Sequence, residues 1–150
     1  MIRYFFILIL PVFTLGQSNW VIFDSENSPL PYNQINDLHL DLENNLIIGT
    51  EYGAAKLNSN LNWEIFFNEG KNTGLSSNII KYINTDLNNN IWFCSPDGAS
   101  VLNTDYTYSY INSNNSNLPS NYIKSLFFEN SNKTWIGTTS GLVLIENNNW

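Results

Sequence analysis

The stretch LPSNYI (residues 118–123), followed at residues 135–142 by WIGTTSGL, decides the fold because both of its parts recur along the chain. The first part returns as LPYNQI from Leu30 and as LSSNII from Leu75, at spacings of 45 and then 43 residues. The second part returns as IIGTEYGA from Ile47 and as WFCSPDGA from Trp92. A period of this length defines a repeated supersecondary unit, so the repeat determines the architecture of the whole chain.

Each repeat predicts four short strands separated by turns. In the middle copy, an aromatic strand at 63–67 leads through a loop to a strand at 79–85, and strands at 91–95 and 99–102 follow. Strands of this length and spacing are typical of antiparallel sheets. The hairpins all place glycine third, at Gly53, Gly98 and Gly141, where a left-handed backbone favours a residue without a Cβ atom.

Apolar residues occupy the predicted strands at mixed parity, as at Ile35 and Leu38, which a sheet with one solvated face does not accommodate. We therefore expect sheets covered on both faces. Four-stranded units of this length in series predict an all-β fold of three β-propeller blades, an incomplete propeller. The alternative is a β-solenoid, which normally has shorter coils. Aromatic residues open successive units and place the repeats at about 20–62, 63–107 and 108–150: Trp20, Trp63, Tyr108 and Trp150.

The composition excludes several classes of protein. With 43% hydrophobic and 15% aromatic residues, the chain is too apolar for a disordered segment. A formal net charge of -7 without any Lys/Arg cluster excludes nucleic acid as a partner. The single cysteine, Cys94, excludes an intramolecular disulfide and any CxxC metal or redox site, and we expect it to be a buried apolar residue. No cofactor and no metal site are expected.

Residues 1–16 have the pattern of a signal peptide. Arg3 provides a basic start, residues 4–13 form an apolar run, and small residues precede the expected cut before Gln17. The apolar run is shorter than the roughly 20 residues that a bilayer-spanning helix needs, so no stable membrane span is expected. We expect cleavage of residues 1–16 and a mature chain, residues 17–150, in the periplasm or outside the cell.

The pattern Leu-Pro-Ser-Asn-x-Ile followed by Trp-Ile-Gly-Thr-x-x-Gly-Leu, complete in residues 118–142, resembles the two-component regulator propeller repeat. The resemblance covers residues 20–150 in three copies in register. It implies a sensor region of the kind found in hybrid histidine kinases that respond to carbohydrates, with a histidine kinase region as a partner. A secreted structural or adhesive propeller without a signalling role is the alternative, and a propeller lyase or glycosidase is disfavoured.

Catalytic residues are not expected, because enzyme chemistry needs convergent groups in distinct roles. The single histidine, His39, lies in a predicted strand and is replaced by Asn84 and Phe127 in the other copies, which favours a structural role. The repeated carboxylates occur once per unit at the same turn, so we expect them to cap turns rather than to form a catalytic pair. They are Asp41, Asp86 and Glu129.

A ligand-binding surface is expected where the loops before the innermost strands meet the glycine turns, because propeller geometry brings both to one face. The recurrent asparagines of these loops, Asn33, Asn78 and Asn121, are expected to structure them. The variable residues present aromatic and polar groups suited to a glycan or another polar ligand. They are Tyr32, Glu51, Tyr52, Asp97, Asn114 and Tyr122.

Three blades are fewer than the roughly 4 to 8 that close a propeller. An open arc exposes apolar faces and strand edges at both ends, which template association. Further blades are therefore expected as partners, either in the same chain, of which this sequence would be a part, or by self-association, in which two chains supply six blades. Trp150 lies in register with the other opening aromatic residues and is expected to begin a fourth unit.

Overall fold

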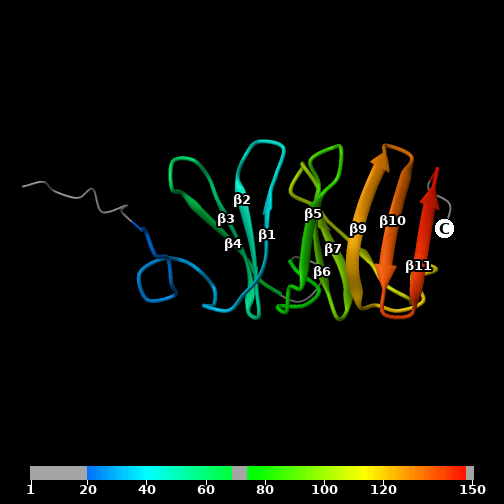
Figure 1. The fold of residues 1–150 in the computed structure, drawn as a ribbon, viewed down its shortest axis with the longest axis horizontal. Coiled ribbons are helices and arrows are strands. Elements are labelled where there is room, and N and C mark those ends of the chain that lie inside the picture. Colours follow the sequence, from blue (N-terminus) through cyan, green and yellow to red (C-terminus); the bar gives the residue numbers. More distant parts are fainter. Residues whose placement is uncertain (1–19, 69–73, 148–150) are drawn as a thin grey trace, which may run out of the picture.

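The computed structural model describes residues 20–68 and 74–147, and all regular secondary structure in these ranges is β-strand. Three antiparallel sheets follow one another along the molecule (Figure 1). The first contains β1 (Ile35–Leu40), β2 (Leu46–Thr50), β3 (Gly53–Leu57) and β4 (Trp63–Phe66). The second contains β5 (Tyr82–Thr85), β6 (Ile91–Ser95), β7 (Gly98–Leu102) and β8 (Tyr108–Ile111). The third contains β9 (Ile123–Asn130), β10 (Lys133–Thr138) and β11 (Gly141–Glu146).

The predicted all-β fold of stacked sheets is confirmed, whereas the predicted signal peptide at 1–16 lies outside the described residues. The sequence repeats and the sheets are offset by one strand. Trp63, which opens a repeat in the sequence, pairs with Leu57 and so begins the fourth strand of the preceding sheet. Tyr108 likewise pairs with Leu102 in the second sheet. Each aromatic strand therefore closes one sheet before the chain crosses to the next.

The predicted strand at 79–85 is shorter in the structure, where β5 begins only at Tyr82. The cause is a hydrogen bond between sheets: the backbone N–H of Ile80 donates to the carbonyl oxygen of Thr50 at 2.9 Å. Ile80 therefore pairs with the first sheet, and its neighbour Lys81 donates to the carbonyl of Cys94 in its own sheet at 2.8 Å. This crossing links consecutive sheets through the main chain.

Both faces are buried in the second sheet, as the mixed parity predicted, whereas in the first sheet Ile35 and Leu38, on which that prediction rested, are exposed. On β2, Ile47 belongs to the core between the first and second sheets, whereas its neighbour Ile48 belongs to a cluster on the opposite face. A second core between the second and third sheets contains Trp92, Ile123 and Ile136. Cys94 is fully buried in this core, as expected, and burial raises the pKa of its thiol.

A close approach between sheets occurs at Gly49. A Cβ atom on Gly49 would lie 2.8 Å from Cγ2 of Ile80 and 3.0 Å from Cδ1 of Ile83. Only glycine leaves room for these two side chains of the following sheet. The small Cys94 occupies the corresponding position of the second sheet.

The glycine turns have the expected positive φ values, 104° at Gly53 and 113° at Gly98. A hydroxyl before each turn holds it closed. Thr50 Oγ1 donates to the carbonyl of Gly53 at 2.8 Å, and Ser95 Oγ donates to that of Gly98 at 3.0 Å. The Ser95 hydroxyl in the middle repeat therefore makes the same hydrogen bond as the threonine hydroxyl in the others.

Turn capping by the repeated carboxylates is confirmed in two of the three units. Asp41 Oδ1 accepts the backbone N–H of Asn45 at 2.8 Å, and Asp86 Oδ1 accepts that of Asn90 at 2.9 Å. The prediction is wrong for Glu129, whose longer side chain accepts the indole N–H of Trp135 at 2.9 Å instead. In the part of the chain that the structure describes, no helix is long and apolar enough to cross a membrane.

Candidate functional site

The strand register gives the stack of sheets two distinct ends. Ile35 at the start of β1 pairs with Thr50 at the end of β2, so the loops before β1, β5 and β9 lie beside the glycine turns. We call this the glycine end, and we call the opposite end, with the turns after β1, β5 and β9, the acidic end. All six residues predicted to bind a ligand lie in loops and turns of the glycine end, so the predicted geometry is confirmed, and their ligand role stays a prediction.

The recurrent asparagines structure the loops of the glycine end, as expected. The side-chain oxygens of Asn33, Asn78 and Asn121 accept the backbone N–H of Ser25, Asn68 and Ser113 respectively, each at 2.7 Å. The same bond recurs in all three repeats. It fixes the chain that arrives from the aromatic strand against the loop that enters the next sheet.

Three tyrosines supply aromatic surface at the glycine end. Tyr32 and Tyr52 are exposed, and the Tyr52 ring meets Phe67 edge to face, with 6.1 Å between centroids. Tyr122 is half-buried and carries the ammonium of Lys124 over its ring, 4.3 Å from the centroid. Tyr32 and Tyr52 belong to the first sheet and Tyr122 to the third, so the structure distributes these rings along the arc rather than gathering them into one pocket.

Glu51 holds two sheets together. Its Oε1 accepts hydrogen bonds from the Gln34 amide at 3.2 Å and the Asn36 amide at 3.0 Å, and it forms an ion pair with Lys81 of the second sheet. The hydrogen bond from Lys81, with that from Asn36, lowers the pKa of Glu51. The carboxylate is therefore ionised at neutral pH.

The other two predicted residues are exposed turn residues. The backbone N–H of Asp97 donates to Ser95 Oγ at 3.1 Å, and that of Asn114 donates to Asn112 Oδ1 at 2.9 Å. These bonds engage main-chain groups. The side chains of Asp97 and Asn114 lie in exposed positions of the glycine end.

His39 lies on β1 toward the acidic end, half-buried. Burial lowers its pKa, against the opposing effect of the nearby carboxylates of Asp37 and Asp41. The neutral imidazole at pH 7 fits the structural role expected of it. Among the described residues, no group of three or more His, Cys, Asp or Glu side chains is placed to hold a metal ion.

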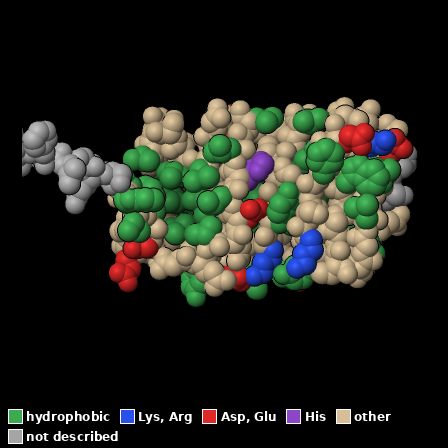
Figure 2. Space-filling view, in the orientation of Figure 1, with side chains coloured by type: hydrophobic (Ala, Val, Ile, Leu, Met, Phe, Trp, Pro, Cys, Tyr) green, Lys and Arg blue, Asp and Glu red, His purple; other side chains and the backbone are tan. Residues whose placement is uncertain are grey.

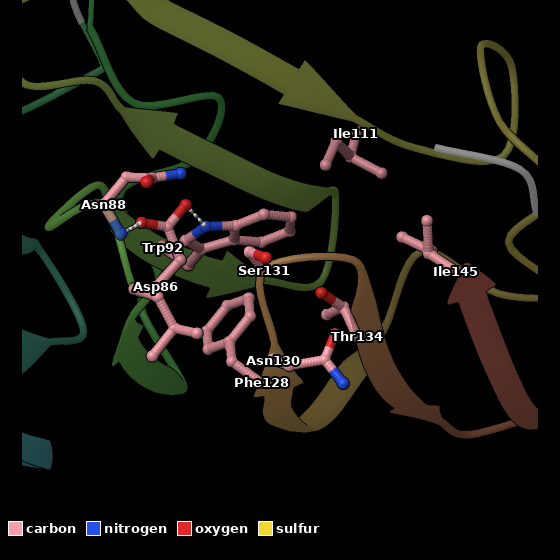
Figure 3. Close-up of a pocket in the computed structure, with 10 residues that line it drawn as sticks. Asp86, Asn88, Trp92, Ile111, Phe128, Asn130, Ser131, Thr134 and Ile145 are labelled. Atoms are coloured by element: carbon pink, nitrogen blue, oxygen red, sulfur yellow. Dashed lines mark hydrogen bonds between the residues drawn. The ribbon is translucent and has the colours of Figure 1, made fainter. Parts of the chain in front are cut away.

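The sequence did not predict a pocket of about 310 Å³ between the second and third sheets (Figure 3). The edge of the Trp92 indole meets the Phe128 ring in it, with 5.4 Å between centroids. Neutral polar groups complete the wall: Asn130 at the end of β9, Ser131 in the following turn and Thr134 on β10. Its volume is at the lower limit for small-molecule sites. None of the six predicted residues lines it.

Lys56 and Glu64 face each other across β3 and β4 and line two other cavities, of about 100 Å³ and about 320 Å³. The corresponding pair in the second sheet, Val101 and Ser109, does not line the pocket beside Trp92. No signal in the sequence predicts this pocket, because its walls come from strands of two different sheets.

Lys56 also neutralises the first acidic turn, since its ammonium lies 3.2 Å from Asp41 Oδ2. Burial acts to raise the pKa of Asp41, but the hydrogen bonds from Asn45 and from Lys56 outweigh it, and the pKa is lowered. In the second unit, Asp86 Oδ2 instead accepts from the Asn90 amide at 2.8 Å and from the Trp92 indole at 3.4 Å. The Asp86 carboxylate, which lines the pocket, is thus hydrogen-bonded to groups of its own sheet.

Comparison with known proteins places this architecture among solved folds. No family model and no curated protein matches the sequence. The extracellular domain of a protein described as a hybrid two-component system, BT3049 from B. thetaiotaomicron, superposes on 89% of this chain with a TM-score of 0.70 and 19% identity. PorZ, described as a surface component of the type-IX secretion system of Porphyromonas gingivalis, superposes on 75% with a TM-score of 0.57 and 18% identity.

The chain is built of β-propeller blades. The resemblance to two-component regulator propellers is thereby confirmed at the level of the fold. The blades span 18% of the BT3049 domain and 17% of the PorZ structure, so they correspond to a small part of each. A streptogramin B lyase also superposes on 77% of this chain and 41% of its own, with a TM-score of 0.49 and 20% identity, a likeness too weak to bear on activity.

Proposed function

We propose that these blades form a non-catalytic, exported recognition module, a sensor-type propeller that binds a polar ligand such as a glycan. The observation that carries the proposal is the superposition of 89% of the chain on the extracellular domain of a hybrid two-component system. A histidine kinase region is the proposed signalling partner. The proposed location is the periplasm or the cell exterior, after cleavage of residues 1–16.

The chemistry of the glycine end supports a neutral, polyhydroxylated ligand. Exposed rings at Tyr32 and Tyr52 offer apolar surface, and phenol hydroxyls and the Asn114 side chain offer hydrogen bonds. A large net charge of opposite sign is not needed to bind such a ligand, and the chain has an excess of carboxylates rather than cations. An anionic ligand would be repelled by this excess.

The separation of the titratable groups supports a non-catalytic role. His39 lies half-buried on β1, and the nearby carboxylate of Asp41 caps a turn. Glu51 is held by Lys81 in an ion pair between sheets. Acid–base catalysis needs groups that converge on one substrate atom, and these do not.

A glycan array with the full chain tests the proposal. We expect binding that weakens by about tenfold in Tyr32→Ala or Tyr52→Ala, since each removes an exposed stacking surface worth roughly 1.4 kcal/mol. Tyr106→Ala is the matched control, because Tyr106 is an exposed tyrosine of the acidic end. Asn130→Ala tests the pocket beside Trp92, which Asn130 lines and which lies at the acidic end. Absence of binding to every glycan would reject the carbohydrate ligand, and loss of binding only in the Asn130→Ala variant would move the site to the other end.

The similarity to PorZ favours a second candidate, a secreted surface protein without a signalling role. Cell fractionation and mass spectrometry of the mature chain address the location shared by both candidates. A chain that begins at Gln17 in the periplasmic or extracellular fraction is the expected result, and an uncut cytosolic chain would contradict both. Glycan-dependent phosphorylation of a kinase region would then favour the sensor over the surface component.

A further inference from the structure

The pocket beside Trp92 has a carboxylate in its wall (Figure 3). Among the described residues that line this pocket, Asp86 alone carries a charge. Its carboxylate accepts the backbone N–H groups of Asn88 and Asn90, each at 2.9 Å, and the Asn90 side-chain amide at 2.8 Å. The Trp92 indole adds a longer bond of 3.4 Å. All of these donors are neutral, so hydrogen bonding leaves the negative charge of Asp86 uncompensated.

The first unit shows how a cation compensates the same carboxylate. There the Lys56 ammonium lies 3.2 Å from Oδ2 of Asp41, the counterpart of Asp86. The strand register places Val101 at the position of Lys56 in the second sheet. An aliphatic side chain thus replaces the ammonium, and Asp86 forms no ion pair with any described residue. A cation beside Asp86 has to come from a ligand.

The third unit also pairs its carboxylate with a cation. Lys133 Nζ lies 4.0 Å from Glu129 Oε1 and 3.5 Å from Glu146 Oε1. Figure 2 shows basic and acidic side chains side by side over the third sheet. Lys133 precedes Thr134, which lines the pocket, but these two carboxylates engage its ammonium. Asp86 therefore differs from both of its counterparts in having no basic partner within the described part of the chain.

Two aromatic rings occur at this junction of sheets and not at the corresponding positions of the preceding one. Trp92 and Phe128 line the pocket, with 5.4 Å between their ring centroids. The strand register makes Ile47 and Thr85 their counterparts at the junction of the first and second sheets. Aromatic rings attract a cation because the face of the ring is electron-rich, and indole attracts it most strongly. A carboxylate next to an indole and a phenyl ring is therefore suited to an organic cation.

The rest of the wall suits the remainder of a small amphipathic ligand. Ile111 and Ile145 add apolar surface. Asn130 Oδ1 accepts a backbone N–H at 2.9 Å, which leaves the amide nitrogen of Asn130 to donate. The hydroxyls of Ser131 and Thr134 form no hydrogen bond with other described residues. A volume of about 310 Å³ limits the ligand to a single small molecule.

We propose that this pocket binds a small organic cation of the quaternary ammonium class. The positive nitrogen lies beside the Asp86 carboxylate, its methyl groups contact Trp92 and Phe128, and a hydroxyl of the ligand bonds to Asn130 or Ser131. A quaternary nitrogen has no N–H to donate, so it needs the charge of Asp86 and not a free lone pair. The net charge of -7 also attracts cations to the chain. The site is separate from the glycine end and does not rest on the glycan proposed there.

Isothermal titration calorimetry of the full chain with choline, at constant ionic strength, tests the proposal. The matched ligand is the uncharged analogue of choline in which a carbon atom replaces the nitrogen, since it has the same shape without the charge. We expect choline to bind with a dissociation constant in the millimolar range or below. The uncharged analogue should bind at least about tenfold more weakly, because it loses the attraction of both the carboxylate and the rings.

Two variants remove the groups that recognise the cation. Asp86→Asn removes the charge and keeps the turn, because Asn58 caps a turn of the same kind, its Oδ1 accepting two backbone N–H groups at 2.9 Å and 3.0 Å. Phe128→Leu removes a ring and keeps an apolar side chain. Asp105→Asn is the control, since Asp105 is an exposed carboxylate at the same end of the second sheet and does not line the pocket. Circular dichroism verifies each fold, and Phe128→Leu carries the test if Asp86→Asn does not fold.

The affinity for choline should fall by about tenfold in Asp86→Asn and by about threefold or more in Phe128→Leu, and it should be unchanged in Asp105→Asn. Absence of choline binding to the wild type would overturn the proposal, as would equal binding of the uncharged analogue. Undiminished binding to Asp86→Asn, or an equal loss in Asp105→Asn, would show that choline binds elsewhere or through the overall charge, and either result would overturn it as well.

Discussion

Replacement of Ile83 by alanine measures how much the stacking of sheets contributes to stability. Ile83 is fully buried between the first and second sheets, where its Cδ1 lies against Gly49. The change removes three carbons, about 2.4 kcal/mol of transfer free energy at roughly 0.8 kcal/mol for each. A residual cavity between two sheets adds to this, so we expect the free energy of unfolding to fall by about 3–4 kcal/mol.

Leu38→Ala is the matched control, because it removes the same number of carbons at the corresponding position of the first sheet. With 57% of Leu38 exposed, the covered fraction of the side chain accounts for about 1 kcal/mol. Urea titrations followed by tryptophan fluorescence at low micromolar concentration compare the two variants, and a second, lower concentration separates folding from association. Equal losses in the two variants, or a loss below about 1 kcal/mol for Ile83→Ala, would refute the stacked-sheet packing on which the argument depends.

Three further predictions concern single groups. The pKa of Glu51 is lowered by the hydrogen bond from Lys81, so its contribution to stability is present above its ordinary pKa of 4.5 and is lost as the pH falls below that value. The urea midpoint of wild type should therefore drop more than that of Glu51→Gln between pH 6 and pH 3, and parallel curves would contradict this. Because burial raises the pKa of Cys94, its thiol should react with a disulfide reagent only upon unfolding; prompt reaction of the folded chain would count against the core assignment. Thr85 Oγ1 is buried without a hydrogen-bond partner among the described residues. Thr85→Val should therefore leave the free energy of unfolding unchanged or raise it by about 1 kcal/mol in the same urea titration. A fall of about 1 kcal/mol would show that the hydroxyl has a partner.

Local features of the fold were predictable because the signals that specify them lie within a few residues. Gly53 and Gly98 adopt positive φ because the hairpin needs it, and the sequence shows them at the same place in each repeat. The side-chain oxygens of Asn78 and its two counterparts accept the same backbone hydrogen bond in all three repeats. Mixed strand parity predicted sheets covered on both faces, since a residue such as Ile48 next to Ile47 needs its own core.

The candidate site was predictable only in its placement at one end of the sheets. Strand direction and turn order fix which loops lie together, so Tyr52 and Tyr122 were assigned correctly to the glycine end. The role of Glu51 depended on Lys81, 30 residues away in another sheet, and no local pattern reports such a partner. The pocket beside Trp92 is lined by side chains of two sheets, such as Trp92 and Phe128, which meet only after stacking.

The sequence by itself therefore determined the class of fold, the period, the strands and the turns, because each depends on neighbouring residues and on a repeat that can be aligned by eye. Only the tertiary structure decided which sheet each aromatic strand joins, where β5 begins, and which faces are covered. Trp63 has the same local sequence whether it opens one sheet or closes another, and its pairing with Leu57 is settled by hydrogen bonds across the sheet. Likewise, Leu38 and Ile83 are alike in sequence, and they differ because a preceding sheet covers only one of them.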